Sequence, residues 1–398
     1  MKIAIVAPTY MPARRANTIQ VAKMAQAFCA LGHQVRLAVP IDFHVEGSSR
    51  IASKSGLLAR DSWVEFASHY GLRERFPIDW LPARRHLRRY DYGFGSVRWA
   101  RGWAADLVYT RLPQCAAVAS ILRVPVIYEI HDIPSRGSAS LLLRLFMLGR
   151  GARRLVVITR ALAEELVARK GIPSDPSFTI IAPDGVDLER YTNLPSANEA
   201  RGLISEKLAG FPDQFTVGYT GHLYAGRGIE LLLDLASRLP EVNFLIVGGE
   251  PEDVERLRDE AGRRGLKNAL LTGFVPNAEL PLYQACCEVL VMPYQEQVAA
   301  SSGGDIAAYL SPMKVFEYLA CGRAILSSDL PVLSEVLNPK NAVLLPSTEI
   351  VPWVRAIERL RSDREFRERL GATARKDAGQ YSWEARAAKI LHNLADQS

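Results

Sequence analysis

The sequence has few cysteines and no long hydrophobic run, and both absences exclude whole classes of protein. Its five cysteines form no C-x-x-C pair and no metal-binding spacing. They predict buried free thiols in a reducing compartment instead of a disulfide framework. No apolar segment approaches the roughly 20 residues that a membrane-spanning helix needs. The first residues form a strand-like run and not a signal peptide. We therefore expect a cytoplasmic protein.

Two common nucleotide-binding motifs are also missing. The chain has no G-x-G-x-x-G and no P-loop where its first strand is predicted, which argues against the usual dinucleotide-binding and NTPase classes. No set of residues has the spacing of a metal site, and no residue stands out as a covalent nucleophile. We therefore expect neither a metal nor a cofactor.

The length and charge of the chain favour a two-domain enzyme with an anionic partner. A chain of 398 residues with 48% hydrophobic residues can build two domains, each with its own core. The net charge is +6 and the isoelectric point is about 9.0. That charge suits a phosphate, nucleotide, nucleic acid or membrane surface without choosing among them.

Short apolar runs alternate with helical patterns along most of the chain. One series runs from Lys2–Ala7 to Phe178–Ala182, and a second runs from Phe215–Thr220 to Ala342–Leu345. This alternation is typical of doubly wound α/β sheets, which bind ligands beyond the carboxyl ends of their strands. We predict two Rossmann-like domains, residues 1–200 and 213–375, that face a cleft. The loop after the first strand carries Arg14 and Arg15, and Asn17 is predicted to cap the helix that follows, in a capping box with Gln20.

Residues 311–322 read as a short helix with both ends marked. Ser311 can cap the first turn, Pro312 suits the first helical position, and Gly322 can adopt the left-handed conformation that closes a helix. The start of such a helix offers free N–H groups and the positive end of the peptide dipoles, so it can hold phosphate.

Two charged side chains of this helix extend the same idea. Lys314 adds a positive charge, and Glu317 offers a carboxylate one turn on, at a reach that suits two sugar hydroxyls. Phosphate at one end and a diol at the other describe a nucleotide. The alternative is a capped amphipathic helix with one solvated Lys–Glu pair. The glycine-rich loop 221–228 favours the nucleotide, because its His222 and Arg227 add cations beside another helix start.

Two further features leave alternatives open. His131 follows a predicted buried strand, where a doubly wound sheet places its site, although most isolated histidines are structural. Between Arg73 and Trp103, eight arginines stand against three acids, among aromatic residues. This composition suits an anionic membrane interface or single-stranded nucleic acid, and a solvated arginine face is the plain alternative.

With these residues assembled, the chain resembles the GT-B retaining glycosyltransferases of family four over nearly its whole length. Residues 221–228 with the helix start at Ile229 resemble the donor phosphate loop of that family, with His222 and Arg227 where it usually has arginine and lysine. Pro183–Asp187 resembles its Pro-Asn-Gly-Val-Asp segment. Residues 311–322 resemble its nucleotide-binding helix, and Ser382-Trp383 resembles the segment by which a final helix, here 376–398, returns to the N-terminal domain.

The resemblance implies transfer of a sugar, of the hexosyltransferase type, from a nucleotide-diphosphate sugar to a glycan or lipid-linked acceptor, with retention of configuration. It implies no nucleic acid partner. If residues 73–103 bind a membrane, we expect the protein to lie on the inner face of that membrane. The implied catalytic residues are His131, Arg227 and Lys314. The implied donor-binding residues are Gly221, His222, Arg227, Met313, Lys314 and Glu317, and the acceptor-side loop contains Arg14, Arg15 and Asn17.

The sequence departs from the family pattern at two places. Many members carry two glutamates separated by seven residues, and here Tyr309 stands at the first position, with Asp305 as a conceivable substitute. The paired glycines of the first loop are replaced by Arg14-Arg15-Ala16. These departures keep two other hypotheses open: a non-catalytic protein that binds nucleotide sugars, and a nucleotide-sugar epimerase.

Overall fold

The computed structural model describes residues 1–41, 60–134, 137–208, 211, 213–299 and 305–394, and it divides into two compact units. Unit 1 contains Met1–Pro183 and Trp383–Ser398, and unit 2 contains Asp184–Ser382. No helix among the described residues is both long enough and apolar enough to cross a bilayer.

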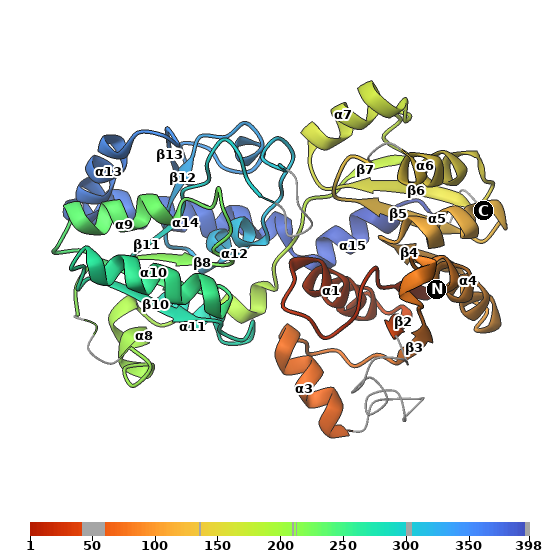
Figure 1. Cartoon of the computed structure of the whole chain (residues 1–398), viewed down its shortest axis with the longest axis horizontal. Coiled ribbons are helices and arrows are strands. Elements are labelled where there is room, and N and C mark those ends of the chain that lie inside the picture. Colours follow the sequence, from red (N-terminus) through yellow and green to blue (C-terminus); the bar gives the residue numbers. More distant parts are fainter. Residues whose placement is uncertain (42–59, 135–136, 209–210, 212, 300–304, 395–398) are drawn as a thin grey trace. The chain divides into compact units, whose positions relative to one another are not determined.

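Unit 1 is built on a seven-stranded parallel sheet with the order β3-β2-β1-β4-β5-β6-β7 (Figure 1). Its central strands β1, β4 and β5 are almost fully buried, mainly apolar runs, as expected for a sheet covered on both faces. Helices α1 and α15 lie side by side on it, although they come from opposite ends of the chain. The strands are β1 Lys2–Val6, β2 Gln34–Ile41, β3 Ile78–Pro82, β4 Leu107–Thr110, β5 Val126–Ile130, β6 Ala152–Val157 and β7 Thr179–Ile181. The helices are α1 Ala16–Ala30, α3 Arg60–Tyr70, α4 Tyr90–Gly102, α5 Pro113–Ile121, α6 Ser138–Leu148, α7 Arg160–Lys170 and α15 Trp383–Leu391.

Unit 2 repeats the design with a six-stranded parallel sheet in the order β10-β9-β8-β11-β12-β13. In both sheets the strand order reverses beside the first strand, which creates the switch point where such folds bind ligands. The strands are β8 Thr216–Thr220, β9 Asn243–Val247, β10 Ala269–Gly273, β11 Val289–Met292, β12 Ala324–Ser328 and β13 Val343–Leu345. The helices are α8 Ala197–Leu203, α9 Ile229–Arg238, α10 Pro251–Arg263, α11 Leu280–Ala285, α12 Met313–Cys321, α13 Ile350–Ser362 and α14 Arg364–Ala378.

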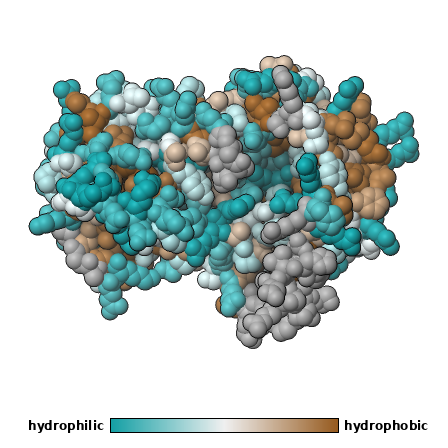
Figure 2. Space-filling view, in the orientation of Figure 1, coloured by the Kyte–Doolittle hydropathy of each residue, from teal (hydrophilic) through white to brown (hydrophobic). Residues whose placement is uncertain are grey.

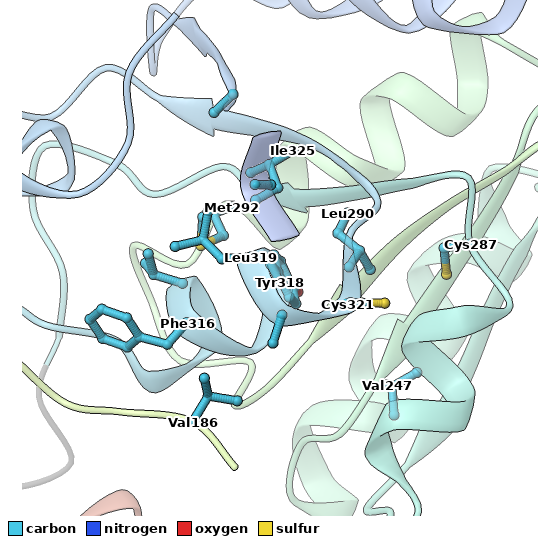
Figure 3. Close-up of a cluster of buried hydrophobic side chains, with 14 of the residues drawn as sticks. Val186, Val247, Cys287, Leu290, Met292, Phe316, Tyr318, Leu319, Cys321 and Ile325 are labelled. Atoms are coloured by element: carbon cyan, nitrogen blue, oxygen red, sulfur yellow. The ribbon is translucent and has the colours of Figure 1, made fainter. Parts of the chain in front are cut away.

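The core of unit 2 encloses α12. Figure 3 shows Phe316, Tyr318 and Leu319 of this helix among side chains of β11 and β12, in one buried cluster. The hydroxyl of Tyr318 accepts a hydrogen bond of 2.8 Å from the Thr220 N–H, so the helix is also tied to the end of β8. Helix α12 is therefore tied through Tyr318 to the carboxyl end of the central strand β8.

The predicted doubly wound class is confirmed, but the unit boundaries differ from the predicted domains. The chain enters unit 2 at Asp184, before residue 200, where the first predicted domain ends. The reason is packing: Tyr191, Ala200 and Ile204 are buried in the core of unit 2. The return to unit 1 comes at Trp383 instead of residue 376, because α14 still packs on β12 and α12. Strand β3 and helices α3, α4 and α8 were not predicted from the sequence.

Candidate functional site

The loop from Gly221 to Gly228 follows β8 at the switch point of unit 2. Its backbone lies so close to the segment after β11 that side chains are excluded. A Cβ on Gly226 would lie 2.0 Å from the carbonyl oxygen of Gln297, and one on Gly228 would lie 1.9 Å from that of Pro293. Both glycines have positive φ, 81° and 76°. The glycines thus let the loop fold down and bring its side chains to the sheet edge.

Two cations meet beside this loop. The Nζ atom of Lys314 lies 3.7 Å from the ring centre of Tyr219 and 5.4 Å from that of Tyr294, and the guanidinium of Arg227 lies 5.0 Å from the Tyr294 ring. A Cβ on Gly221 would come within 2.7 Å of Lys314 Nζ. Within the described ranges, neither Lys314 Nζ nor Arg227 Nε has a hydrogen-bond partner, and both atoms are buried.

This pairing is electrostatically costly in the absence of an anion. Burial, followed by the charge of Arg227, lowers the pKa of Lys314 well below its ordinary value, and Glu317 opposes this only in part. Burial, then Lys314 and Arg227, also lowers the pKa of His222, whose ring stacks on Tyr224 at 4.7 Å. An anion beside these groups would offset the cost of burying their positive charges and the repulsion between them.

Helix α12 begins later than predicted. Pro312 is its N-cap, with extended backbone (ψ 124°), so Ser311 lies outside the helix and makes no capping bond. The prediction for Ser311 was wrong because the residue before the first helical turn here is the proline itself. The N–H of Val315 bonds the Pro312 carbonyl at 3.0 Å, whereas those of Met313 and Lys314 lie too early for an intrahelical acceptor. The closing Gly322, with φ 70°, is as predicted.

Glu317 lies one turn after Lys314 on α12 and is half-buried. Its Oε2 accepts a hydrogen bond of 3.3 Å from the side-chain amide of Gln284 on α11. The carboxylate is thereby held in place at the same sheet edge as the two cations. The predicted donor residues of loop 221–228 and of α12 are thus brought together in unit 2.

Asp305 and Tyr309 have a local structural part in the loop before α12. Oδ1 of Asp305 accepts two hydrogen bonds of 2.9 Å, from the N–H groups of Val298 and Ala307. These bonds lower its pKa below the ordinary value. The Tyr309 hydroxyl lies 3.4 Å from the Asp305 carbonyl oxygen. The neighbouring Ser301-Ser302-Gly303-Gly304 segment lies outside the described residues.

His131 follows β5 in unit 1 and contacts a carboxylate that sequence analysis missed. Its Nε2 donates to Oε1 of Glu129, a residue only 1% exposed. Burial by itself would raise the pKa of Glu129, but Arg386 and His131 together outweigh it and lower the pKa. Glu129 was overlooked because it stands inside a run that reads as an ordinary buried strand.

The loop after β1 is organised differently from the predicted capping box. Helix α1 begins at Ala16 with Arg15 as its N-cap, and no side chain caps it, so Asn17 lies within the first turn. Gln20 points to Glu129 instead, at 2.7 Å. The capping prediction failed because Thr18 bonds the carbonyl of Ala13 at 2.8 Å and holds the turn from inside. Arg14 and Arg15 are exposed, and Oδ1 of Asn17 is buried with no partner on the described chain.

The basic and aromatic stretch 73–103 forms β3, α4 and the turn between them. The tryptophans of this stretch, Trp80, Trp99 and Trp103, are partly structural. The side chains of Lys2 and Arg36 lie over the Trp103 ring, and none of the three tryptophans is among the exposed large hydrophobic residues. Tyr90 and Phe94 of α4 are 44% and 57% exposed. The part of this stretch that is open to a partner therefore includes the exposed residues Tyr90, Phe94, Arg98 and Arg101 of α4 and, before this helix, Arg73, Arg75, Arg84 and Arg88.

Two family models match the chain. The model described as glycosyl transferases group 1 matches residues 201–377, and the model described as Glycosyltransferase Family 4 matches residues 18–190. The D-inositol 3-phosphate glycosyltransferase of Xylanimonas cellulosilytica is 28% identical over 244 residues, which are 60% of this chain and 55% of that protein. Sulfoquinovosyl transferase SQD2 of Arabidopsis thaliana is 26% identical over 290 residues, 69% of this chain and 52% of that protein. The chain thus spans about half the length of these curated relatives.

The fold also matches solved structures along its full length. The structure of Anabaena Alr3699/HepE in complex with UDP aligns with a TM-score of 0.71 at 18% identity and covers 100% of both chains. At this identity the likeness concerns the fold, which is the two-domain GT-B architecture that the sequence resemblance implied.

Proposed function

Since the chain belongs to glycosyltransferase family four, the group 1 glycosyl transferases, we propose that it transfers a sugar from a nucleotide-diphosphate sugar to an acceptor hydroxyl. We propose that the anomeric configuration is retained and that the product is a polysaccharide or another glycoconjugate. The nucleotide sugar is a co-substrate, and the reaction proposed needs no metal or other cofactor.

The observation that carries this proposal is the buried pair of cations beside the start of α12. Lys314 Nζ and Arg227 Nε are buried without hydrogen-bond partners on the described chain, next to the free N–H groups of Met313 and Lys314. A diphosphate supplies what such a place lacks: two negative charges and several acceptor oxygens. Glu317, one turn along, would accept hydrogen bonds from the ribose hydroxyls.

The same groups suit the chemistry of transfer. As the bond between the sugar and the diphosphate breaks, negative charge grows on the departing oxygen. Arg227, Lys314 and the N–H groups of the helix start are already oriented to stabilise that charge, which is electrostatic preorganisation. Gly221 allows the close approach, and His222 contributes from the loop. We assign His131 in unit 1 to the donor sugar, and the acceptor would attack from the face that the diphosphate leaves.

The donor base and the acceptor can be narrowed through the relatives. Structures of Anabaena HepE contain UDP and UDP-glucose, so UDP sugars are the first donors to test. We assign Arg14, Arg15 and Asn17 to the acceptor side and propose a glycan or a lipid-linked glycan as acceptor. Tyr309 and Asp305 remain candidates for donor contact in the loop before α12.

A membrane-facing role of unit 1 completes the proposal. Exposed aromatic residues on α4 stand among exposed arginines, and Leu141 and Leu148 of α6 are 57% and 69% exposed. Figure 2 shows hydrophobic residues gathered over α5 and α6. Arginines with exposed apolar side chains suit an anionic bilayer surface. We therefore propose a cytoplasmic enzyme that binds the inner face of a membrane. Loss of sedimentation with anionic vesicles as salt rises would support this, and no sedimentation at low salt would refute it.

A non-catalytic protein that binds nucleotide sugars, called here a silent binder, is the second candidate, because Tyr309 stands where many members carry a glutamate.

The deciding experiment is a thermal-shift panel of nucleotide diphosphates and their sugars, followed by product analysis. We expect stabilisation by one nucleotide, loss of most of that shift in Glu317→Ala, and no loss in Glu358→Ala, an exposed glutamate on α13. Transfer with a retained anomeric signal by NMR supports the enzyme. Binding without transfer or hydrolysis supports the silent binder, and isomerised sugar without acceptor supports an epimerase.

A further inference from the structure

The carboxylate of Glu129 is the centre of a buried polar cluster in unit 1. It accepts hydrogen bonds from Gln20 of α1 at 2.7 Å, from the Tyr109 hydroxyl of β4, from His131 after β5 and from Arg386 of α15 at 2.9 Å. Four donors from four separate elements therefore meet on one side chain that is 1% exposed. Glu129 is not among the site residues predicted from the sequence.

Arg386 brings the end of the chain into this cluster. It is 5% exposed and donates to Glu129, to the carbonyl of Ala182 at 3.0 Å and to the carbonyl of Pro183 at 2.8 Å. Helix α15 packs on α1, so its arginine closes the cluster between the two ends of the sequence. The guanidinium keeps the carboxylate ionised and therefore able to accept from all four donors.

The geometry fixes the ring of His131. Residues 129 and 131 lie two apart at the end of β5, so their side chains point to the same side of the chain. Because the Glu129 carboxylate can only accept a hydrogen bond, Nε2 of His131 must carry the proton that it donates. The His131 ring cannot rotate without losing this bond. In metal sites, a carboxylate that accepts a hydrogen bond from one ring nitrogen of a histidine fixes the tautomer and orientation of the ring in the same way.

We propose that Glu129 and Arg386 are positioning residues that hold His131 in its working orientation and tautomer. The inference rests on the proposed function, in which His131 faces the donor sugar. A stabilising role alone accounts poorly for the pair, because two apolar side chains of similar size would fill the same space without the cost of burying two charges.

The test uses the full-length protein and two sets of variants. The double variant Glu129→Leu/Arg386→Met removes both charges together, so that neither is left buried alone, and Glu129→Gln is the isosteric second choice. The matched control is Arg154→Met, because Arg154 also anchors α15, through the carbonyls of Ile390 and His392, without contacting Glu129 or His131 in any bond described. Each variant is measured for nucleotide affinity, kcat and donor KM.

We expect the double variant to lose at least tenfold in kcat while its nucleotide affinity stays within twofold, because the nucleotide is bound by unit 2. The control should keep kcat within threefold even if its melting temperature falls. In a His131→Ala background, the same double substitution should lower kcat no further, since the ring it positions is gone. An equal loss in both backgrounds, or an equal loss in the control, would overturn the inference.

A spectroscopic readout separates this inference from the proposed function. The side-chain 15N signals of His131 should report a single protonated Nε2 in the native protein and a tautomer mixture in Glu129→Gln or the double variant. If the native protein transfers no sugar from any donor, the proposed function fails, and these signals still decide the positioning. Unchanged His131 signals in both variants would refute it.

Discussion

Replacing Lys314 by methionine should make the ligand-free protein more stable and at the same time weaken its binding of nucleotide diphosphates. The side chain is embedded between two aromatic rings, its ammonium nitrogen is buried, and it has no carboxylate in hydrogen-bond contact among the described residues. Methionine has a similar length and flexibility and can fill the same space. The variant therefore removes a buried charge and leaves the packing almost unchanged.

Two opposing contributions set the size of the effect. The cation lies 3.7 Å from the Tyr219 ring centre, and a desolvated cation–π contact contributes about 2 kcal/mol. Burying an unpaired ion costs several kcal/mol, and Arg227 adds repulsion. We expect the free energy of unfolding to rise by about 1 to 3 kcal/mol. The melting temperature should then rise by about 2 to 4 °C for each kcal/mol in a unit of this size.

The gain should depend on pH in a defined direction. The pKa of Lys314 lies below its ordinary value of 10.5, so the unfolded chain binds this proton more readily than the folded chain does. The native protein therefore loses stability as pH falls from about 10.5 through the lowered pKa, and stays less stable below it. The advantage of Lys314→Met should therefore grow as pH falls from about 10.5 through the lowered pKa of Lys314, and fade as pH rises toward 10.5.

The assay is urea unfolding of both proteins at neutral and alkaline pH, together with nucleotide titration. Loss of the charge-assisted contacts should weaken diphosphate binding by about 10- to 100-fold. Lys23→Met is the control, because Lys23 is also a buried lysine, 2% exposed, but donates to the Gly71 carbonyl at 2.6 Å. That variant should be destabilised. A destabilised Lys314→Met protein at neutral pH, or undiminished nucleotide affinity, would refute the reasoning.

Three further outcomes follow from the geometry. Glu317→Gln should weaken binding of the nucleotide by roughly tenfold without changing the melting temperature of the ligand-free protein by more than a few degrees, because it alters one charge-assisted contact; calorimetric titration measures this. Gly228→Ala should lower the free energy of unfolding by more than about 2 kcal/mol, since its Cβ would lie 1.9 Å from a carbonyl oxygen, whereas Gly262→Ala on α10 has open space and should stabilise slightly. Because the pKa of Glu129 is lowered, its contribution is present above the ordinary glutamate value of 4.5 and is lost as pH falls below it, so Glu129→Gln should flatten the acid side of the stability curve.

The fold could be predicted from sequence to a large extent because its strands are local signals. Runs such as Asn243–Val247 and Val289–Met292 are short, apolar and bounded by turn residues, and they form β9 and β11 within the second predicted series, which runs from Phe215–Thr220 to Ala342–Leu345. The missed strand, Ile78–Pro82, ends in a proline and lies beside arginines, and it forms only because β2 offers it a parallel partner. Strand pairing over that distance leaves no trace in the local pattern.

The candidate site divides along the same line. The glycine loop and Gly322 were readable because their backbone conformation depends on the residue itself. Gly322 has the positive φ predicted for it, and Gly221, Gly226 and Gly228 of the loop also have positive φ. The capping predictions for Asn17 and Ser311 failed for the opposite reason. Each residue has the right side chain, but the true turn is held by neighbours, Thr18 in one case and Pro312 in the other. A cap is a competition among adjacent residues, and the spacing alone does not decide it.

Glu129 marks the limit of what the sequence can give. A carboxylate within the apolar strand 126–130 already indicates a buried charge, and a buried charge requires a cation, because an unpaired one would be neutralised or would unfold the strand. The sequence therefore predicts that Glu129 has a cationic partner. It does not identify this partner, because the chain has 49 lysines and arginines, and the one that pairs with Glu129, Arg386, lies 257 residues away in the sequence. It reaches Glu129 only because the chain crosses to unit 2 and returns in α15. A charge in a core strand thus predicts that a distant element must come back, while the folded protein identifies which one.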